Sequence, residues 1–180
     1  MPTFLKVGIF YNHMSSLMRK LHLLRTGKKD DILDISLICE NLFICGWPAG
    51  KHAPQIAELG ITFIISMIRE KQDIELTQPP FQNLQLNTTD FVLTPISTDK
   101  LRQGVEAALP VIENGGNVLT YCKSGIHRSA AMATCILIGQ EYTVDEAIHM
   151  VKEGRAAAKP DTAHIIKQIE KFAEEWQSKR

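Results

Sequence analysis

The sequence predicts an α/β fold with a central mixed, largely parallel sheet flanked by helices on both faces. Strand-like and helix-like segments alternate along the chain, as they do where crossover helices join parallel strands. The β-rich run Asn117–Tyr121 is followed, after a short glycine-containing loop, by an almost wholly apolar run of helix length at 129–138. In such a fold, the loop at the carboxyl end of a strand is the expected position of a functional site.

Residues 1–29 differ in charge from the remainder of the chain. They contain six lysines and arginines and no acidic residue, whereas the whole chain has a formal net charge of zero. Apolar residues recur at helical spacing between Phe10 and Leu24, so we expect a basic amphipathic N-terminal helical extension. Three interpretations stay open for it: a helix packed on the following domain, a contact with an anionic membrane surface, and a mitochondrial transit peptide.

The middle of the chain carries a strand signal, a helix signal and a turn signal in that order. Residues 84–86 are strand-like and run into a polar turn. A helix is expected from Ser97 to Ile112, with Asp99 in its first turn, where a carboxylate stabilises the helix dipole. The turn residues 114–116 then lead into the β-rich run.

The run at 129–138 is expected to be a buried helix, because it is apolar on all sides and is ended by Gly139. A further helix should begin at a capping box formed by Thr143 and Glu146 and should end near Gly154.

Asp161 is the expected cap of the last helix. That helix carries one apolar stripe, which we expect to face the core. The stripe consists of Ile165, Ile169, Phe172 and Trp176.

The length and composition indicate one compact domain over residues 30–180, since the chain has 180 residues of which 44% are hydrophobic and 22% charged. No apolar run is long enough to span a bilayer and no secretory signal is evident, so we expect a cytoplasmic protein, with mitochondrial and membrane-peripheral locations left open by residues 1–29. The cysteines show neither a disulfide framework nor paired metal-ligand spacing, which favours a reducing compartment and no bound metal. They are Cys39, Cys45, Cys122 and Cys135.

The loop after the β-rich run has the composition of a phosphate-binding cradle with a nucleophile at its base. Cys122 stands at its start, Gly125 permits a tight turn, and Arg128 offers a planar fork for two phosphate oxygens. Backbone N–H groups at the following helix start would add converging donors. The thiol of Cys122 should then ionise readily, with its pKa lowered from about 8.5 toward about 4 to 6.

This loop resembles the signature of the protein tyrosine phosphatase superfamily, and specifically of the small dual-specificity phosphatases, His-Cys-x2-Gly-x2-Arg-Ser/Thr. The match comprises Cys122, Gly125, Arg128 and Ser129, whereas Tyr121 stands where the family usually has histidine. The resemblance extends over most of the stretch from Ile35 to Trp176. Residues 42–46 and 59–66 resemble further family segments, and Pro160 before an amphipathic helix fits the family's C-terminal end.

The resemblance implies a phosphatase catalytic domain that works through a phosphocysteine intermediate and needs no cofactor. Cys122 would be the nucleophile, Arg128 would bind the phosphoryl oxygens, and Ser129 would hydrogen-bond the sulfur. The family's general acid is an aspartate about thirty residues before the cysteine, a position that Asp90 occupies, and Asp99 is the runner-up for this role. The substrate phosphate would lie against the loop residues Lys123, Ser124, Gly125, Ile126, His127 and Arg128.

The expected substrates are phosphotyrosine and phosphoserine or phosphothreonine of proteins. Lys123 and His127 add basic character to the loop, which leaves phosphoinositides or other non-protein phosphates open as substrates. Tyr121 motivates a different class of function, a phosphate-binding pseudophosphatase or scaffold, and a rhodanese-type sulfur-transfer enzyme is a further alternative. The sequence shows no basic patch with interleaved aromatics for nucleic acid, and it leaves the oligomeric state open.

Overall fold

The computed structural model describes residues 32–89, 91 and 93–178. The predicted helix in residues 1–29 and the predicted acid Asp90 therefore lie outside the described residues. In chain order the elements are β1 (Ile35–Cys39), β2 (Leu42–Cys45), the 3-10 turn η2 (Gly50–His52), α3 (Ala53–Glu58), β3 (Ile61–Ser66), the 3-10 turn η3 (Ile74–Leu76), β4 (Gln82–Gln85), α4 (Thr98–Glu113), β5 (Asn117–Tyr121), α5 (Arg128–Gly139), α6 (Val144–Gly154) and α7 (Ala163–Gln177).

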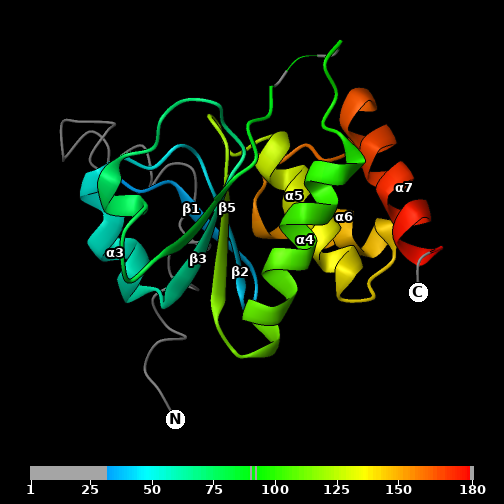
Figure 1. Cartoon of the computed structure of the whole chain (residues 1–180). Helices are drawn as coiled ribbons and strands as arrows, with labels where there is room; N and C mark the ends of the chain where they lie inside the picture. Colours follow the sequence, from blue (N-terminus) through cyan, green and yellow to red (C-terminus); the bar gives the residue numbers. More distant parts are fainter. Residues whose placement is uncertain (1–31, 90, 92, 179–180) are drawn as a thin grey trace.

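The five strands form one sheet in the order β1-β2-β5-β3-β4. Only β1 pairs antiparallel, with β2, and every other neighbouring pair is parallel. Figure 1 shows α3 on one side of this sheet and the helices α4 to α7 on the other. The predicted mixed, largely parallel sheet with helices on both faces is thus confirmed.

Strand β5 lies at the centre of the sheet, between β2 and β3, and four of its five residues are buried. Apolar residues in an almost continuous run are expected of such a strand, because helices cover both faces of a parallel sheet. The loop that follows β5 consequently opens at the middle of the sheet's carboxyl edge, where ligands bind in open α/β folds.

Helix α5 is the central helix of the layer that contains α4 to α7. All twelve of its residues are buried, and it packs against β5, β2, α4, α6 and α7. The prediction of a buried helix at 129–138 is therefore confirmed, and Cys135 within this helix is fully buried. A helix enclosed on every side has little freedom to shift, so the loop at its N-terminus is held on a rigid support.

The capping box at the start of α6 is also confirmed. The backbone N–H of Thr143 donates to Glu146 Oε2 at 2.9 Å, and the N–H of Glu146 donates to Thr143 Oγ1 at 3.3 Å. The cap predicted for the last helix is wrong: the residue before α7 is Thr162, and the Asp161 carboxylate forms an ion pair with Lys152 at 2.5 Å. A lysine within reach at the end of α6 gave this carboxylate a charged partner, which sequence spacing did not reveal.

The apolar stripe of α7 faces inward as predicted. Ile165, Ile169 and Phe172 are buried, and Phe172 stacks on Trp176 with ring centroids 5.4 Å apart. Among the residues that the structure describes, no helix is long and apolar enough to cross a membrane.

Candidate active site

The site is built where β5 ends and α5 begins. The hydroxyl of Thr120 donates to the carbonyl of Ser129 at 3.1 Å, which ties the strand to the first turn of the helix across the loop. The N–H of Met67, just after β3, donates to the carbonyl of Tyr121 at 2.8 Å. Both bonds fix the two ends of the loop 122–127, so that its residues form a closed turn over the helix N-terminus.

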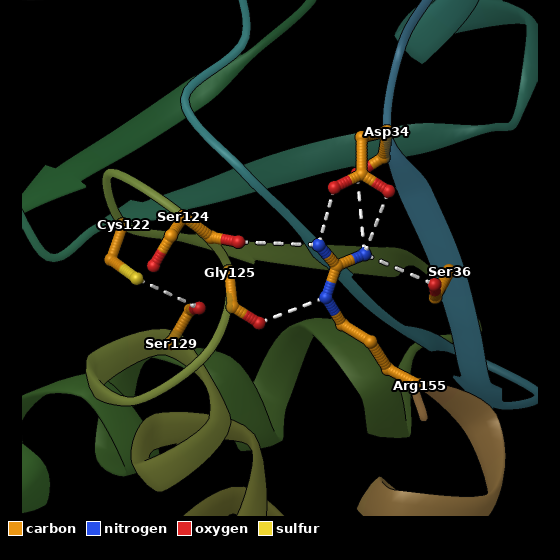
Figure 2. A network of polar contacts seen from close by, with 7 residues as sticks. All are labelled: Asp34, Ser36, Cys122, Ser124, Gly125, Ser129 and Arg155. Carbon is orange, nitrogen blue, oxygen red and sulfur yellow. Dashed lines mark hydrogen bonds and ion pairs between the residues drawn. The ribbon is translucent and has the colours of Figure 1, made fainter. Parts of the chain in front are cut away.

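Cys122 is fully buried at the base of this loop, and the Ser129 hydroxyl donates to its sulfur at 3.3 Å (Figure 2). Burial opposes ionisation of the thiol. Hydrogen bonds from the Ser129 hydroxyl and from the backbone N–H groups of Ser129 and Ser124, with the charge of Arg128, nevertheless lower the pKa of Cys122. The thiolate therefore forms at lower pH than that of an ordinary cysteine.

The other three cysteines have pKa values shifted the opposite way. Burial raises the pKa of Cys39, and raises that of Cys45 and Cys135 well above the ordinary value. The contrast shows that burial alone does not activate Cys122. The donors of the loop do so, and they act on this sulfur.

Arg128, the first residue of α5, is only 3% exposed. Its Nη1 donates to the carbonyl of Met67 at 2.9 Å and to the carbonyl of Thr88 at 3.0 Å. Two fixed acceptors on one nitrogen set the plane of the guanidinium, which a single contact would leave free to rotate. The same contacts bring the segments after β3 and β4 to the edge of the site.

Gly125 has φ of +68°, in the left-handed region that disfavours a side chain. A Cβ at this position would lie 2.8 Å from the carbonyl carbon and oxygen of Cys45 and 2.7 Å from Nη2 of Arg155. The loop thus passes between the end of β2 and an arginine from beyond α6, and only glycine fits there.

The basic residues of the loop are less available than the sequence indicated. Lys123 is exposed and forms an ion pair with Glu70 at 2.5 Å, and this pair lowers the pKa of the Glu70 carboxyl. The half-buried ring of His127 lies edge-on to that of His164, with centroids 5.9 Å apart. The inference of a strongly basic loop for polyanionic substrates is weakened, because a carboxylate already accompanies Lys123.

Tyr121 is fully buried and its hydroxyl donates to Gln72 Oε1 at 2.8 Å. Gln72 is held in turn by Asn83, with two reciprocal amide hydrogen bonds of 2.8 Å. Burial raises the pKa of the phenol, so Tyr121 stays neutral. Its polar atom is therefore satisfied by Gln72, and the donors that act on the Cys122 sulfur come from other residues.

Of the two candidate acids, Asp99 lies within the described residues and Asp90 lies outside them. Asp99 lies in the first turn of α4, its side chain is 87% exposed, and it pairs with Arg102 at 3.5 Å. This is the dipole-stabilising position predicted for it. Two positions before Asp90, the carbonyl of Thr88 accepts a hydrogen bond from Arg128 at 3.0 Å. The assignment of Asp90 as the general acid therefore stays a prediction.

Sequence reasoning missed three residues behind the loop, namely Arg155, Asp34 and Ser36. Figure 2 shows Asp34 and Ser36 beside the guanidinium of Arg155. Arg155 is 5% exposed and donates to the carbonyl of Gly125 at 2.8 Å through Nε. Asp34 and Ser36 come from the chain at and just before β1. Nothing in the local sequence marks them, since they are separated from the loop by dozens of residues.

Three comparisons with known proteins agree with this geometry. Residues 42–175 match the family described as "Dual specificity phosphatase, catalytic domain". The chain is 28% identical over 144 residues to Dual specificity phosphatase 28 of Mus musculus, a match that covers 76% of this chain and 82% of that protein. It is 24% identical over 150 residues to Tyrosine-protein phosphatase yvh1 of Schizosaccharomyces pombe, which covers 81% of this chain and 43% of that protein.

A solved structure shares the fold as well. The crystal structure of human DUSP28 superposes with a TM-score of 0.72 at 25% sequence identity, covering 80% of this chain and 95% of that one. The family match spans four of the five strands, β2 to β5, together with the Cys122 loop and most of α7. On this evidence the chain belongs to the dual specificity phosphatases, within the cysteine-dependent protein tyrosine phosphatase superfamily.

Proposed function

We propose that this protein hydrolyses phosphomonoesters of phosphoproteins through a phosphocysteine intermediate on Cys122. The observation that carries the proposal is the lowered pKa of a buried cysteine inside a loop of converging donors, next to a fixed arginine. The family supplies the activity class, a cysteine-dependent dual specificity phosphatase. The residues supply the chemistry.

In the first step the Cys122 thiolate attacks phosphorus in line with the leaving oxygen. The sulfur–phosphorus bond forms while the phosphorus–oxygen bond breaks, and the carboxylic acid of Asp90 gives its proton to the departing oxygen. The loop amides and the Arg128 guanidinium hold the three remaining phosphoryl oxygens as charge moves onto them. The products are a free alcohol or phenol and phosphocysteine.

In the second step a water molecule attacks phosphorus and the sulfur–phosphorus bond breaks. Asp90, now a carboxylate, accepts the proton of that water, and inorganic phosphate leaves. The hydroxyl of Ser129, 3.3 Å from the sulfur, would stabilise the departing thiolate. At the end of the cycle Cys122 is again a thiolate and Asp90, reprotonated by the water, is again a carboxylic acid, so the scheme uses no metal or cofactor.

Asp90→Asn should slow hydrolysis in a way that depends on the leaving group. A phosphoserine peptide releases a poor alkoxide and should lose about a hundredfold in kcat, because an amide cannot donate the missing proton. An aryl phosphate such as p-nitrophenyl phosphate should lose far less. Steady-state kinetics on both substrates measure the difference.

Asp99→Asn is the matched control for this prediction, since the same chemical change is made on an exposed first-turn carboxylate. It should leave both rates unchanged. A leaving-group-dependent loss in Asp99→Asn, or equal slowing of both substrates by Asp90→Asn, would transfer the acid role away from Asp90.

A substrate panel tests the function as a whole. Phosphotyrosine, phosphoserine and phosphothreonine peptides, phosphoinositides and thiosulfate are assayed side by side, with orthovanadate as inhibitor. We expect vanadate-sensitive turnover of the phosphopeptides that exceeds turnover of the lipids, since Lys123 is already ion-paired with Glu70. Turnover of thiosulfate alone, or phosphatase activity that vanadate leaves intact, would contradict the proposed mechanism.

The alternative of a phosphate-binding pseudophosphatase rests on Tyr121. The hydroxyl of Tyr121 is directed to Gln72, and the lowered pKa of Cys122 comes from Ser129, Ser124 and Arg128. A binder without turnover has no use for an activated thiolate. Tight phosphopeptide binding with no vanadate-sensitive turnover in the panel would favour this alternative over catalysis.

A further inference from the structure

The back of the phosphate loop is held by one arginine that the catalytic scheme does not use. Arg155 follows α6, and its backbone N–H donates to the carbonyl of Val151. Its side chain is 4% exposed and runs to the loop from the side opposite Cys122 and Ser129, as Figure 2 shows. The guanidinium therefore lies behind the loop and does not enter the anion pocket in front of it.

Two carbonyl groups of the loop are turned toward this guanidinium. Nε of Arg155 donates to the carbonyl of Gly125 at 2.8 Å, and Nη2 donates to the carbonyl of Ser124 at 3.3 Å. In a planar trans peptide the C=O and N–H bonds point in opposite directions. Fixing these two carbonyls behind the loop therefore directs the N–H groups of Gly125 and Ile126 toward its front, where Cys122 lies.

The guanidinium is itself held from its far side. Asp34 forms a two-point ion pair with it, at 2.5 Å from Nη2 to Oδ2 and 3.2 Å from Nη1 to Oδ1. The hydroxyl oxygen of Ser36 lies 3.2 Å from Nη1. A bidentate carboxylate sets the plane of an arginine as no lysine contact can. The loop is thus tied to the start of the sheet through a rigid connector.

We propose that Arg155, oriented by Asp34 and Ser36, is a positioning residue for the phosphate loop. It keeps the peptide groups of Ser124 and Gly125 turned so that the following N–H groups point to the front of the loop, where the substrate phosphate would bind. This inference rests on the proposed function, since it explains how the same loop is kept competent for anion binding. Removing Arg155 releases two carbonyls, which are then free to rotate toward the pocket and repel a bound anion.

The test uses the full chain with Arg155→Met, which keeps the length of the side chain and removes its donors, and Arg155→Lys. Arg102→Met is the matched control, because Arg102 also makes a partly buried ion pair, with Glu175 at 2.8 Å, between α4 and α7. Three quantities are measured: the melting temperature, the inhibition constant of orthovanadate, and the pH dependence of Cys122 alkylation by iodoacetamide, located by peptide mass spectrometry.

In Arg155→Met we expect vanadate to bind about tenfold more weakly and the alkylation curve of Cys122 to move to higher pH. The Ser124 N–H lies in the same loop and is one of the donors that lower the pKa of Cys122, so a loop that loses its support is expected to raise that pKa. Arg155→Lys should show nearly the same two changes as Arg155→Met, because one ammonium cannot bind two carbonyls and the Asp34 carboxylate in a fixed geometry. Arg102→Met should lower the melting temperature without moving either of the other two quantities.

Wild-type vanadate affinity and a wild-type alkylation curve in folded Arg155→Met would overturn the proposal. If Arg155→Met does not fold, Asp34→Ala decides, because the Asp34 side chain is 64% exposed and its removal leaves Arg155 in place without its orienting partner. The same two shifts, smaller in size, are then expected, and their absence also overturns the proposal. A wild-type protein that neither binds vanadate nor hydrolyses phosphomonoesters would instead contradict the proposed function itself.

Discussion

Cys122→Ser should lower kcat by about 10⁴-fold or more while leaving vanadate or phosphate binding largely intact. A serine hydroxyl is far less acidic than a thiol, so the donors that produce a thiolate at this position leave an alcohol protonated. The amides of the loop and the Arg128 guanidinium remain in place and can still bind an oxyanion. Steady-state turnover of p-nitrophenyl phosphate, together with calorimetric titration of phosphate, measures the two quantities separately.

Cys45→Ser serves as the control for this variant. Cys45 is also fully buried, but burial raises the pKa of its thiol well above the ordinary value, so it is not expected to act as a nucleophile. Its substitution should leave kcat near that of the wild type in protein that remains folded. Substantial residual turnover in Cys122→Ser would rule out this sulfur as the attacking atom, whatever the family assignment.

Arg128→Lys should reduce kcat/KM by about a thousandfold, even though the formal charge is kept. The guanidinium is anchored by carbonyls of Met67 and Thr88 through one nitrogen and is 3% exposed. An ammonium on a flexible stem cannot satisfy both carbonyls and also present two parallel donors to a phosphoryl group. Both the affinity for the anion and the stabilisation of the transition state are therefore lost.

The pH dependence of the same variant gives a second measurement. Arg128 is one of the groups that lower the pKa of Cys122, although the hydrogen bonds from Ser129 and Ser124 lower it more. Because its fork is no longer fixed in Arg128→Lys, the acid limb of the kcat/KM profile should move to higher pH. Loss of less than about tenfold in kcat/KM, with an unmoved acid limb, would show that the guanidinium does not hold the phosphoryl group.

Several elements could be predicted because their signals are local. The burial of α5 followed from an apolar run with no polar face, and the capping box at Thr143 from the spacing of a hydroxyl and a carboxylate. The lowered pKa of Cys122 followed from a cysteine before a glycine-containing loop and a helix start. Each of these features depends on residues that are neighbours in the chain.

Other features could not be predicted because they depend on pairing at a distance. The prediction that Asp161 caps the last helix was wrong, because the Asp161 carboxylate forms an ion pair with Lys152 on the preceding helix. The basic character assigned to Lys123 overlooked Glu70, which the segment after β3 brings to the loop. Sequence spacing carries no record of which charges will meet across such distances, because the sheet order decides it.

The sequence by itself determined the fold class and the chemical type of the site. Alternating strand and helix signals define the layers, and a cysteine and an arginine separated by five residues, Cys122 and Arg128, suffice to predict an anion loop on a helix N-terminus. Only the tertiary structure decided what supports that loop: the sheet order places β5 between β2 and β3, and brings Asp34 and Arg155 together behind it. The reason is physical, since a peptide group is oriented by the partners that fill the space around it, and those partners here come from remote parts of the chain.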